Sequence, residues 1–421
     1  MPGPAGRPGL RRWFDARLPG VAGAWQRHVG GYFVPRNLNV WYCFGALALL
    51  ALAGQLLTGL FLAMHYVPTA DGAFASVQRI MRDVDGGWLI RYLHAAGASL
   101  FFVVIYLHMA RGLMYGSYRR PRELVWLLGV LLYFVVAAEA FMGYVLPWGQ
   151  MSFWGAKVVA SLFGTVPVIG AALAEWVMGD VVPSGATLSR FFALHVIGIP
   201  LVLLLFVGVH VAALRQVGSS SPDGIDPRHG PRGNRWRADA PASTVPFHPY
   251  QTLKDLVAAG VFMTVLAAIV LLAPDLGGLV LEPDNLIPAD PMSTPGHIRP
   301  AWYFAPYYAM LRSVPGRGAG ALVMSAAAVV LFFLPWLDRA GVASVRQRGL
   351  LAKAMLGLLA VSFVGLGVLG LGSGSTAWET WCARGLTVAY FAFFLLMPWW
   401  SRFDRPHSVG PGHPAAGGEQ Q

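Results

Sequence analysis

The chain has 421 residues, of which 56% are apolar and only 12% are Asp, Glu, Lys or Arg, and its formal net charge is +11. This composition excludes a disordered chain, argues against an ordinary soluble domain and is typical of an integral membrane protein. The only two cysteines, Cys43 and Cys382, are too few for a disulfide framework, so thiol chemistry is excluded as the function.

Long uncharged stretches follow one another along the chain. They cover residues 37–70, 92–110, 124–138, 140–156, 191–214, 256–274, 318–337, 354–378 and 385–401. A helix of about 20 residues crosses the hydrocarbon layer of a membrane, and the two stretches that flank Glu139 merge into one span at 124–146. The sequence therefore predicts an all-α integral membrane protein with eight transmembrane helices.

The connecting segments differ in character. The loop 147–189 contains an interrupted apolar run that indicates interfacial helices, and the loop 276–317 ends in aromatic residues, so that these two elaborated loops are expected to enclose a pocket at one membrane surface. The predicted organisation is an amphipathic segment at 1–36 without a cleavable signal peptide, a four-helix bundle at 37–214, a polar loop at 215–255, C-terminal helices at 256–401 and a flexible tail at 402–421.

Basic residues are concentrated on one side of the predicted membrane. With the amino terminus inside, the inner segments hold 22 Lys or Arg against 9 Asp or Glu, and the rest of the chain holds 9 against 11. These inner segments are 1–40, 111–123, 215–255, 338–353 and 402–421. The asymmetry follows the positive-inside rule and explains the basic net charge without nucleic-acid binding.

Four histidines lie inside two of the charge-free crossings, His94 and His108 on the second and His195 and His210 on the fourth. Steps of 14 and 15 residues return to within about 40° and 60° of the same helix face, and they separate the two levels by about 21 to 22 Å. Each helix therefore offers one imidazole near each membrane surface. Two facing helices of this kind predict two bis-histidine sites.

Haem iron fits these sites best. Imidazole is an axial ligand of iron, whereas a structural zinc site would need further Cys or carboxylate ligands nearby. Covalent c-type attachment is excluded because neither cysteine lies in a Cys-x-x-Cys-His pattern. A single membrane histidine more often bonds a neighbouring helix, but two matched pairs are unexpected on that basis, since polar residues in this setting are rare and usually functional.

Arginines and glycines accompany the histidines at regular intervals. Arg91 and Arg190 precede the outer histidines, and Arg111 and Arg215 follow the inner ones, so basic groups are available for haem propionates. Simple flanking charge is the alternative, and it is stronger for the inner pair. Glycines spaced by 14 residues give room for a porphyrin edge or for close helix packing: Gly45 and Gly59 on the first crossing, Gly129 and Gly143 on the third.

Five stretches resemble cytochrome b, the di-haem quinone-reacting subunit of the cytochrome bc1 complex. They are LTGLFLAMHY (57–66), RYLHAAGAS (91–99), FMGYVLPWGQMSFWGA (141–156), PFHPY with the following KD (246–255) and RPAWYF (299–304). The resemblance runs from about residue 30 to about residue 400. It implies that His94 and His195 ligate an outer haem and that His108 and His210 ligate an inner haem, which agrees with the pairing from the spacing.

The resemblance also implies a reaction and its sites. Quinol, such as ubiquinol, is oxidised at an outer site and quinone is reduced at an inner site, with protons released outside and taken up inside. The inner site is implied at Lys254, Asp255, Ser219 and Arg215. The outer site is implied at Tyr144, Pro147, Trp148, Gly149, Trp302, Tyr303 and Tyr308. Without the resemblance, Lys254 and Asp255 are equally well explained as interfacial anchors at a helix start.

The implied assembly needs other chains, because this one offers no site for a Rieske iron–sulfur cluster or a c-type haem. The expected partners are a Rieske protein, a cytochrome c1-type subunit, membrane lipids and a second copy of this chain. The composition and the lack of a targeting peptide favour a bacterial plasma membrane.

Three residues or intervals depart from the family pattern. The outer-site signature Pro-Glu-Trp-Tyr reads Pro300, Ala301, Trp302, Tyr303, so its proton-accepting glutamate is missing. Glu139, one helical turn from Gly143, is our candidate replacement, because a buried carboxylate in a membrane needs a reason; a hydrogen bond to a tyrosine or to water is the alternative. The 15-residue interval from His195 to His210, and Arg215 in place of a histidine, lean toward the b6f type, but the fused C-terminal crossings favour the bc1 type.

Two other classes of function remain open from the sequence. A di-haem membrane anchor of another quinone-linked oxidoreductase would need the haem bundle alone, which leaves the two elaborated outer loops unexplained. A proton-coupled transporter would use the intramembrane His, Arg and Glu without haem. A reduced-minus-oxidised visible spectrum separates these classes.

Overall fold

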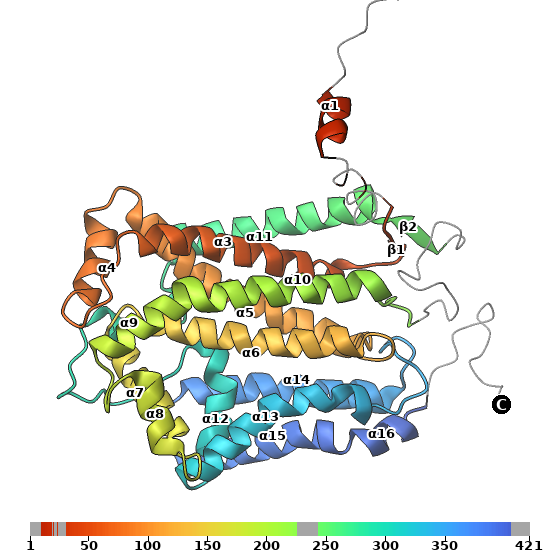
Figure 1. Cartoon of the computed structure of the whole chain (residues 1–421). Coiled ribbons are helices and arrows are strands. Elements are labelled where there is room, and N and C mark those ends of the chain that lie inside the picture. The colour runs from red at the N-terminus through yellow and green to blue at the C-terminus, as the bar shows by residue number, and fades with distance from the viewer. Residues whose placement is uncertain (1–9, 19, 21–22, 24–30, 225–242, 406–421) are drawn as a thin grey trace, which may run out of the picture.

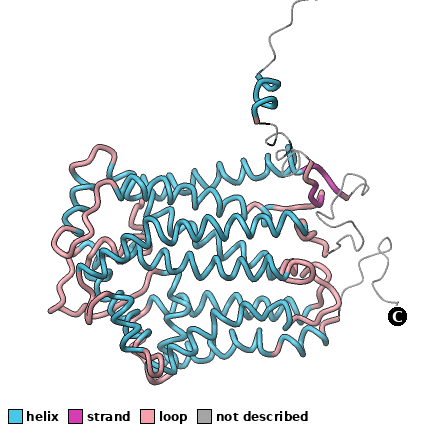
Figure 2. The backbone as a smooth tube through the Cα atoms, viewed as in Figure 1, coloured by secondary structure: helices cyan, strands magenta, loops and turns pink. Residues whose placement is uncertain are grey.

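The computed structural model describes residues 10–18, 20, 23, 31–224 and 243–405. The long helices run side by side, and the short helices gather mainly at one end of them (Figure 1). The described part is almost entirely helical, with one small two-stranded sheet at the other end (Figure 2). The fold class is the predicted all-α membrane architecture.

Long helices form the body of the molecule. They are α3 (Phe44–Ala63), α5 (Gly87–Met114), α6 (Glu123–Val145), α10 (Ile199–Val217), α11 (Thr252–Leu272), α13 (Arg317–Leu337), α14 (Leu350–Leu371) and α15 (Ala377–Leu395). The shorter helices are α1 (Leu10–Arg17), α4 (Ala73–Arg82), α7 (Gln150–Phe163), α8 (Gly170–Met178), α9 (Gly185–Ala193), α12 (Ala305–Ser313) and α16 (Met397–Phe403).

Single turns and strands complete the described chain. The 3-10 turns are η2 (Val40–Tyr42), η5 (Leu276–Gly278), η6 (Pro283–Leu286) and η7 (Trp302–Phe304), and the π-helical turns are η3 (Leu194–Gly198) and η4 (Phe247–Gln251). Strand β1 (Phe33–Pro35) pairs antiparallel with β2 (Thr244–Pro246), with Val34 opposite Val245.

Seven helical stretches of the described chain are long and apolar enough to cross a membrane. An eighth crossing results when α15 and α16 are taken as one span, bent by 65° where they meet. Proline at the first turn of α16 explains this break, because proline cannot continue the hydrogen bonding of the preceding helix. The helix of the fourth crossing is longer than the charge-free stretch 191–214 that predicted it. It runs from Gly185 to Val217 and includes Arg190.

The amino-terminal half is a four-helix bundle, in which α3 packs on α5 and α6 packs on α10. Helix α11 covers α3 and α5, and the C-terminal helices α12, α14 and α15 form a second packed group. The two halves share one core cluster, which includes Phe102 of α5, Val130 of α6 and Tyr303 of η7.

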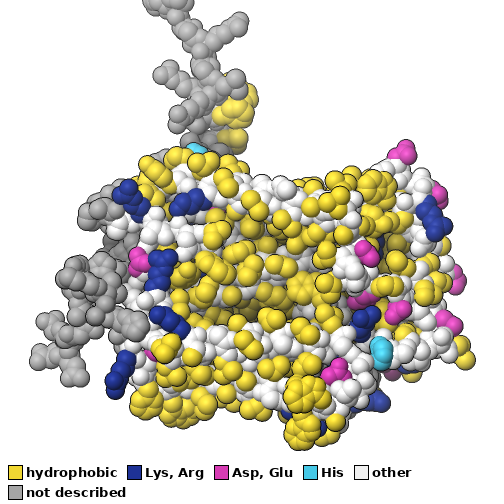
Figure 3. Space-filling view, turned by 180° about the vertical axis from the view of Figure 1, so that it is seen from behind, with side chains coloured by type: hydrophobic (Ala, Val, Ile, Leu, Met, Phe, Trp, Pro, Cys, Tyr) yellow, Lys and Arg dark blue, Asp and Glu magenta, His cyan; other side chains and the backbone are white. Residues whose placement is uncertain are grey.

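One end of the molecule, called here the basic end, brings together the described parts of all five segments predicted to lie inside. Asn37 bonds Asp223, Arg119 donates to the carbonyl of Val342 at 2.6 Å, and Asp404 accepts from the amide of Gly349 at 2.9 Å. Lys and Arg side chains gather toward this end, while Asp and Glu are more frequent at the other (Figure 3). The predicted inner loop between residues 225 and 242 and the tail beyond residue 405 lie outside the described residues.

The opposite end is built from the two elaborated loops. Helices α7 and α8 lie in the first loop, and η5 to η7 lie in the second. The loops bond each other directly: the amide of Gln150 donates to the carbonyl of Ile287 at 3.0 Å, and Ser152 Oγ donates to Asn285 Oδ1 at 3.0 Å. A cavity lies at this end, lined by Pro147 from the first loop and by residues 279–282, Asn285, Leu286, Ala301 and Tyr303 from the second.

Candidate functional site

The bundle brings the four intramembrane histidines together in two facing pairs. The ring centroids of His94 and His195 are 6.2 Å apart, and those of His108 and His210 are 6.5 Å apart. Two metal–imidazole bonds of about 2 Å each, added to the half-widths of two rings, account for such separations. No group of three or more His, Cys, Asp or Glu is placed to hold a metal among the described residues. Each pair therefore suits a metal that brings its other ligands with it, as haem iron does.

A π-helical turn explains the unequal histidine intervals. His195 lies in η3, where the amide of Ile199 bonds the carbonyl of Leu194 five residues earlier. A π-turn takes up one extra residue within a helix and often occurs at functional sites. The 15-residue interval on this helix is thereby made equivalent to the 14-residue interval on α5. The extra residue of the 15-residue interval is therefore taken up locally, within η3.

The outer histidines are oriented from behind through their Nδ1 atoms. The Thr58 hydroxyl, which donates to the carbonyl of Gly54 at 2.7 Å, lies 2.9 Å from His94 Nδ1 and can accept its proton. His195 Nδ1 lies 3.0 Å from both the carbonyl oxygen and the carboxylate Oε1 of Glu139. Such bonds fix the tautomer that leaves Nε2 free to bind a metal. The donor set fits axial ligation.

Each predicted glycine lies against one of the four rings. A Cβ atom would stand 3.3 Å from the His108 ring at Gly45, 3.2 Å from the His94 ring at Gly59 and 3.3 Å from the His210 ring at Gly129. At Gly143 it would stand 2.5 Å from Cε1 of His195, too close for any side chain. The 14-residue glycine intervals thus keep space around both histidine pairs.

The arginines differ in their placement. Arg91 lines the cavity beside His94. Arg111 stacks over Tyr42 at 3.9 Å and donates to Ser117, while its buried Nε has no partner. Arg190 instead donates to the carbonyl of Trp176, away from the cavity.

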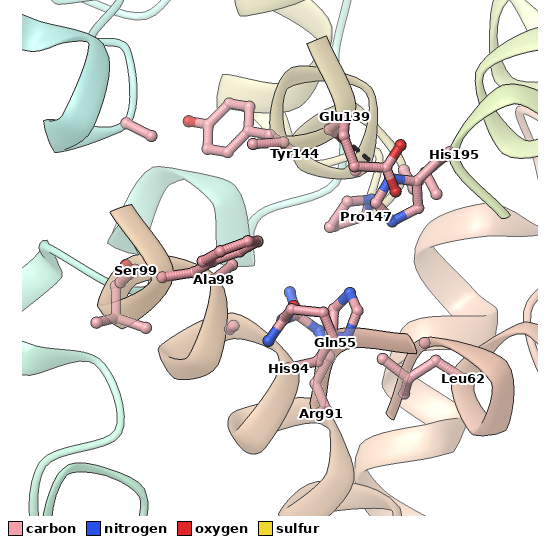
Figure 4. Close-up of a pocket in the computed structure, with 18 of the residues that line it drawn as sticks. Gln55, Leu62, Arg91, His94, Ala98, Ser99, Glu139, Tyr144, Pro147 and His195 are labelled. Atoms are coloured by element: carbon pink, nitrogen blue, oxygen red, sulfur yellow. Dashed lines mark hydrogen bonds and ion pairs between the residues drawn. The ribbon is translucent and has the colours of Figure 1, made fainter. Parts of the chain in front are cut away.

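A cavity of about 460 Å³ opens between the outer histidines and the two loops. Figure 4 shows His94 and Arg91 from α5 facing Glu139, Tyr144 and Pro147 of α6 and the following turn across it, with His195 beside Glu139. Leu56, Phe102, Leu279 and many other apolar side chains make up most of its wall. A mainly apolar cavity with a few converging polar groups is the usual form of a small-molecule site.

The predicted outer-site residues are only partly on this cavity. Tyr144, Pro147, Tyr303 and Glu139 line it. Trp302 donates from its indole nitrogen to Ser99 at 3.2 Å, and Tyr308 donates to the carbonyl of Ile298 at 3.0 Å. Neither of these two side chains is among the lining residues, nor are Trp148 and Gly149.

Glu282 also lines the cavity, and no sequence motif identified it. Its carboxylate accepts a hydrogen bond from the Tyr144 hydroxyl. Burial raises the pKa of Glu282 to about 7, although the bond from Tyr144 and the charge of Arg299 oppose the shift. In the sequence it is one acidic residue in a polar loop, and the only available signal was its position in a loop already expected to enclose the pocket.

At the basic end, Lys254 and Asp255 begin α11. Lys254 Nζ donates to the carbonyl of Leu38 at 2.7 Å, and Asp255 accepts from Gln251 Nε2 at 2.9 Å. Lys254 and Gln251 line a second cavity of about 460 Å³ under the β1–β2 pair.

Arg215 and Ser219 lie at the end of α10 and just beyond it. The Arg215 guanidinium stacks over the ring of Tyr32 at 4.1 Å and over that of Phe247 at 4.9 Å. The Ser219 side chain interacts with the hydroxyl of Tyr32. Since the amide of Phe247 donates to the carbonyl of Tyr32 at 2.7 Å, the strand pair connects this group with the start of α11.

Comparison with known proteins matches this geometry to one family. The family described as "Cytochrome b/b6/petB" matches residues 29–218, and "Cytochrome b(C-terminal)/b6/petD" matches residues 288–391. Cytochrome b of Allochromatium vinosum is 52% identical over 401 residues, which cover 94% of this chain and 96% of that protein. Cytochrome b of Rhodospirillum rubrum is 45% identical over 396 residues, covering 94% and 93%.

A solved structure titled "Hyperthermophilic respiratory Complex III" superposes with a TM-score of 0.84 at 36% identity, covering 92% of this chain and 98% of that one. The histidine pairs, the seven or eight crossings and this similarity over nearly the whole length agree. The chain therefore belongs to the cytochrome b family.

Proposed function

We propose that this chain is the di-haem subunit of a quinol:cytochrome c oxidoreductase. Two non-covalent b-type haems, bound by His94 with His195 and by His108 with His210, would supply one-electron carriers at the two ends of the bundle. The observation that carries the proposal is the pair of facing imidazole couples, 6.2 and 6.5 Å between centroids, in one apolar bundle. The substrate class is a quinol such as ubiquinol, and its product is the quinone.

The outer cavity is proposed to bind and orient the quinol that is oxidised. Tyr144 and Tyr303 present polar edges in a largely apolar wall, which suits a lipophilic ring with hydroxyl groups. Trp302 and Tyr308 would not touch the quinol. Their hydrogen bonds to Ser99 and Ile298 would hold in place the segment that carries Tyr303. A carboxylate of the cavity would take the quinol proton, and the sequence hypothesis assigns this to Glu139.

The inner end is proposed to bind the quinone that is reduced. Lys254 lines a cavity at the basic end, and Asp255 accepts a hydrogen bond from Gln251, which also lines it. These two ionisable groups could transfer protons to a reduced quinone ring. Arg215 and Ser219 both contact Tyr32. They would bind the carbonyl oxygens of the quinone. The four residues support proton uptake on the side opposite to proton release.

The assembly is proposed to resemble respiratory complex III, as the similar solved structure is titled. Partners would then be a Rieske iron–sulfur protein and a cytochrome c1-type subunit, in a homodimer within a bacterial plasma membrane. The basic end, with the amino terminus, would face the cytoplasm, and the reaction would contribute to the proton gradient.

Histidine replacement tests this proposal through the visible spectrum of the purified complex. Each of H94A, H195A, H108A and H210A should lose one b-type band in the reduced-minus-oxidised spectrum. H65A is the matched control, because His65 packs on Phe61 outside the two pairs and should keep both bands. Retention of both bands in any of the four variants would contradict the ligand set. Two bands without quinol oxidation would favour the di-haem anchor.

A further inference from the structure

Two carboxylates line the outer cavity, together with Ala301. The resemblance to cytochrome b implies a glutamate at position 301, and the methyl group of the alanine found there cannot accept a proton. The two carboxylates that line the cavity are Glu139 on α6 and Glu282 just before η6. The positions of their oxygen atoms distinguish their roles.

Glu139 is directed at an imidazole. Its Oε1 lies 3.0 Å from His195 Nδ1, and its Oε2 is buried without a hydrogen-bond partner. Figure 4 shows the Glu139 carboxylate turned toward His195, with Tyr144 on the other side of α6. A carboxylate bound to the back of a ligating histidine orients that ring and raises its basicity. Glu139 is therefore a positioning residue for His195.

Glu282 is directed at the tyrosines of the cavity. The Tyr144 hydroxyl donates to its Oε2, and Tyr303, whose ring stacks on Phe102 at 3.9 Å, is close enough for its pKa to be raised by the Glu282 charge in addition to burial. Both tyrosines line the same cavity. A quinol hydroxyl placed among these side chains would be within reach of the Glu282 carboxylate directly or through Tyr144.

The charges around Glu282 allow it to gain and lose a proton near neutrality. Tyr144 and Arg299 favour its ionised form, while burial and the charge of Asp284 disfavour that form. The resulting pKa of about 7 suits a base that must take a proton and then release it to water. Glu282 is half-buried and lies just before η6, in the loop at the end of the molecule opposite the basic end.

We infer that Glu282 is the outer-site base of this chain and replaces the glutamate absent from its Pro-Ala-Trp-Tyr segment. The inference rests on the proposed function. Quinol oxidation releases two electrons and two protons, and the two one-electron acceptors would be the iron–sulfur partner and the outer haem proposed at His94 and His195. The first proton would pass to the iron–sulfur partner together with its electron. As the other quinol O–H bond breaks, its proton forms an O–H bond on Glu282, which then releases it outside.

The test is the pH profile of quinol oxidation by the intact complex carrying E282Q. In the wild type the rate should rise with pH through about 7, because only the ionised Glu282 accepts a proton. E282Q should lower the rate about a hundredfold, the usual contribution of a general base, and should remove this rise. E282D, which keeps a carboxylate on a shorter arm, should recover part of both.

D284N is the matched control, since it removes a carboxylate two residues away that does not line the cavity. It should keep the rate, with the midpoint of the profile moved slightly toward acid because the Asp284 charge no longer raises the pKa of Glu282. Unchanged b-type bands in each variant verify that the complex is assembled. An equal loss in D284N would overturn the inference in favour of a general effect of loop charge.

Two further outcomes would also overturn it. One is a wild-type rate and profile in E282Q. The other is loss of the pH-dependent rise in E139Q with its retention in E282Q, which would assign the base to Glu139. Failure of the proposed function is distinguishable, because the wild-type complex would then show no quinol oxidation at any pH.

Discussion

At the residue scale, the reduction potential of the proposed outer haem depends on the group that hydrogen-bonds Nδ1 of each histidine. His94 is backed by a neutral hydroxyl from Thr58, whereas His195 is backed by the carboxylate of Glu139. A carboxylate on Nδ1 adds negative charge to the ring, and negative charge near a haem favours its oxidised form. The spacing of the histidines identified the pairs, but it contained no information on these partners.

E139Q is expected to raise the midpoint potential of the outer haem, because it replaces a charged acceptor of His195 Nδ1 by a neutral one of the same shape. A tenfold change in the reduction equilibrium corresponds to about 59 mV for one electron, and we expect a shift of about this size. A potentiometric titration of both b-type bands measures it. The inner haem proposed at His108 and His210 would serve as internal control. An unchanged outer potential would contradict the role of Glu139.

At the element scale, a π-turn changes the helical register of one histidine. The π-turn at Leu194–Gly198 brings His195 into register with His94.

A cluster of ionic groups links the helices at the basic end. Asp338 after α13 accepts from the Tyr118 hydroxyl at 2.6 Å and from Arg348, and lies 3.9 Å from Arg119. Burial would raise the pKa of Asp338, but the charges of Arg348 and Arg119 outweigh it and lower that pKa below its usual value. This ion cluster ties the amino-terminal bundle to the C-terminal helices.

D338N is expected to destabilise the contact between the two halves by about 3–5 kcal/mol, because it leaves the buried Arg348 without its charged partner. Since the pKa of Asp338 is lowered by folding, its contribution is present above the unfolded value of about 3.9 and is lost as pH falls through the folded value. Thermal unfolding in detergent at pH 7 and below pH 4 measures both effects. D223N is the control, since its partner Arg346 is half exposed and the pair should contribute about 1 kcal/mol or less. Equal losses in the two variants would contradict the argument.

At the scale of the whole molecule, charged and apolar side chains are distributed unevenly along the direction of the long helices. Apolar side chains cover the middle of the molecule, and Lys and Arg gather toward one end (Figure 3). That end carries the β1–β2 pair, and the cavity with Glu282 lies at the other end. Because basic loops are retained in the cytoplasm during insertion, the cavity should open on the outer face.

Cysteine labelling tests this orientation. M292C, at a side chain 93% exposed in the second outer loop, should react with a membrane-impermeant maleimide added to intact spheroplasts. R120C, at a side chain 95% exposed at the basic end, should react only after the membrane is opened. The unmodified chain is the control for background from Cys43, which is buried, and from Cys382. The reverse labelling pattern would place the basic end outside.

The sequence by itself determined the membrane class, the crossings, the shared side of the basic segments and the pairing of His94 with His195 and His108 with His210. These follow from hydrophobicity, charge and helix periodicity, which are one-dimensional properties. The tertiary structure alone decided that Tyr144 meets Glu282, 138 positions apart, that Glu139 faces His195, and that Trp302 and Tyr308 do not line the cavity. Such contacts depend on how loops fold over helix ends and on which rotamer each side chain adopts, and no local pattern of residues specifies either.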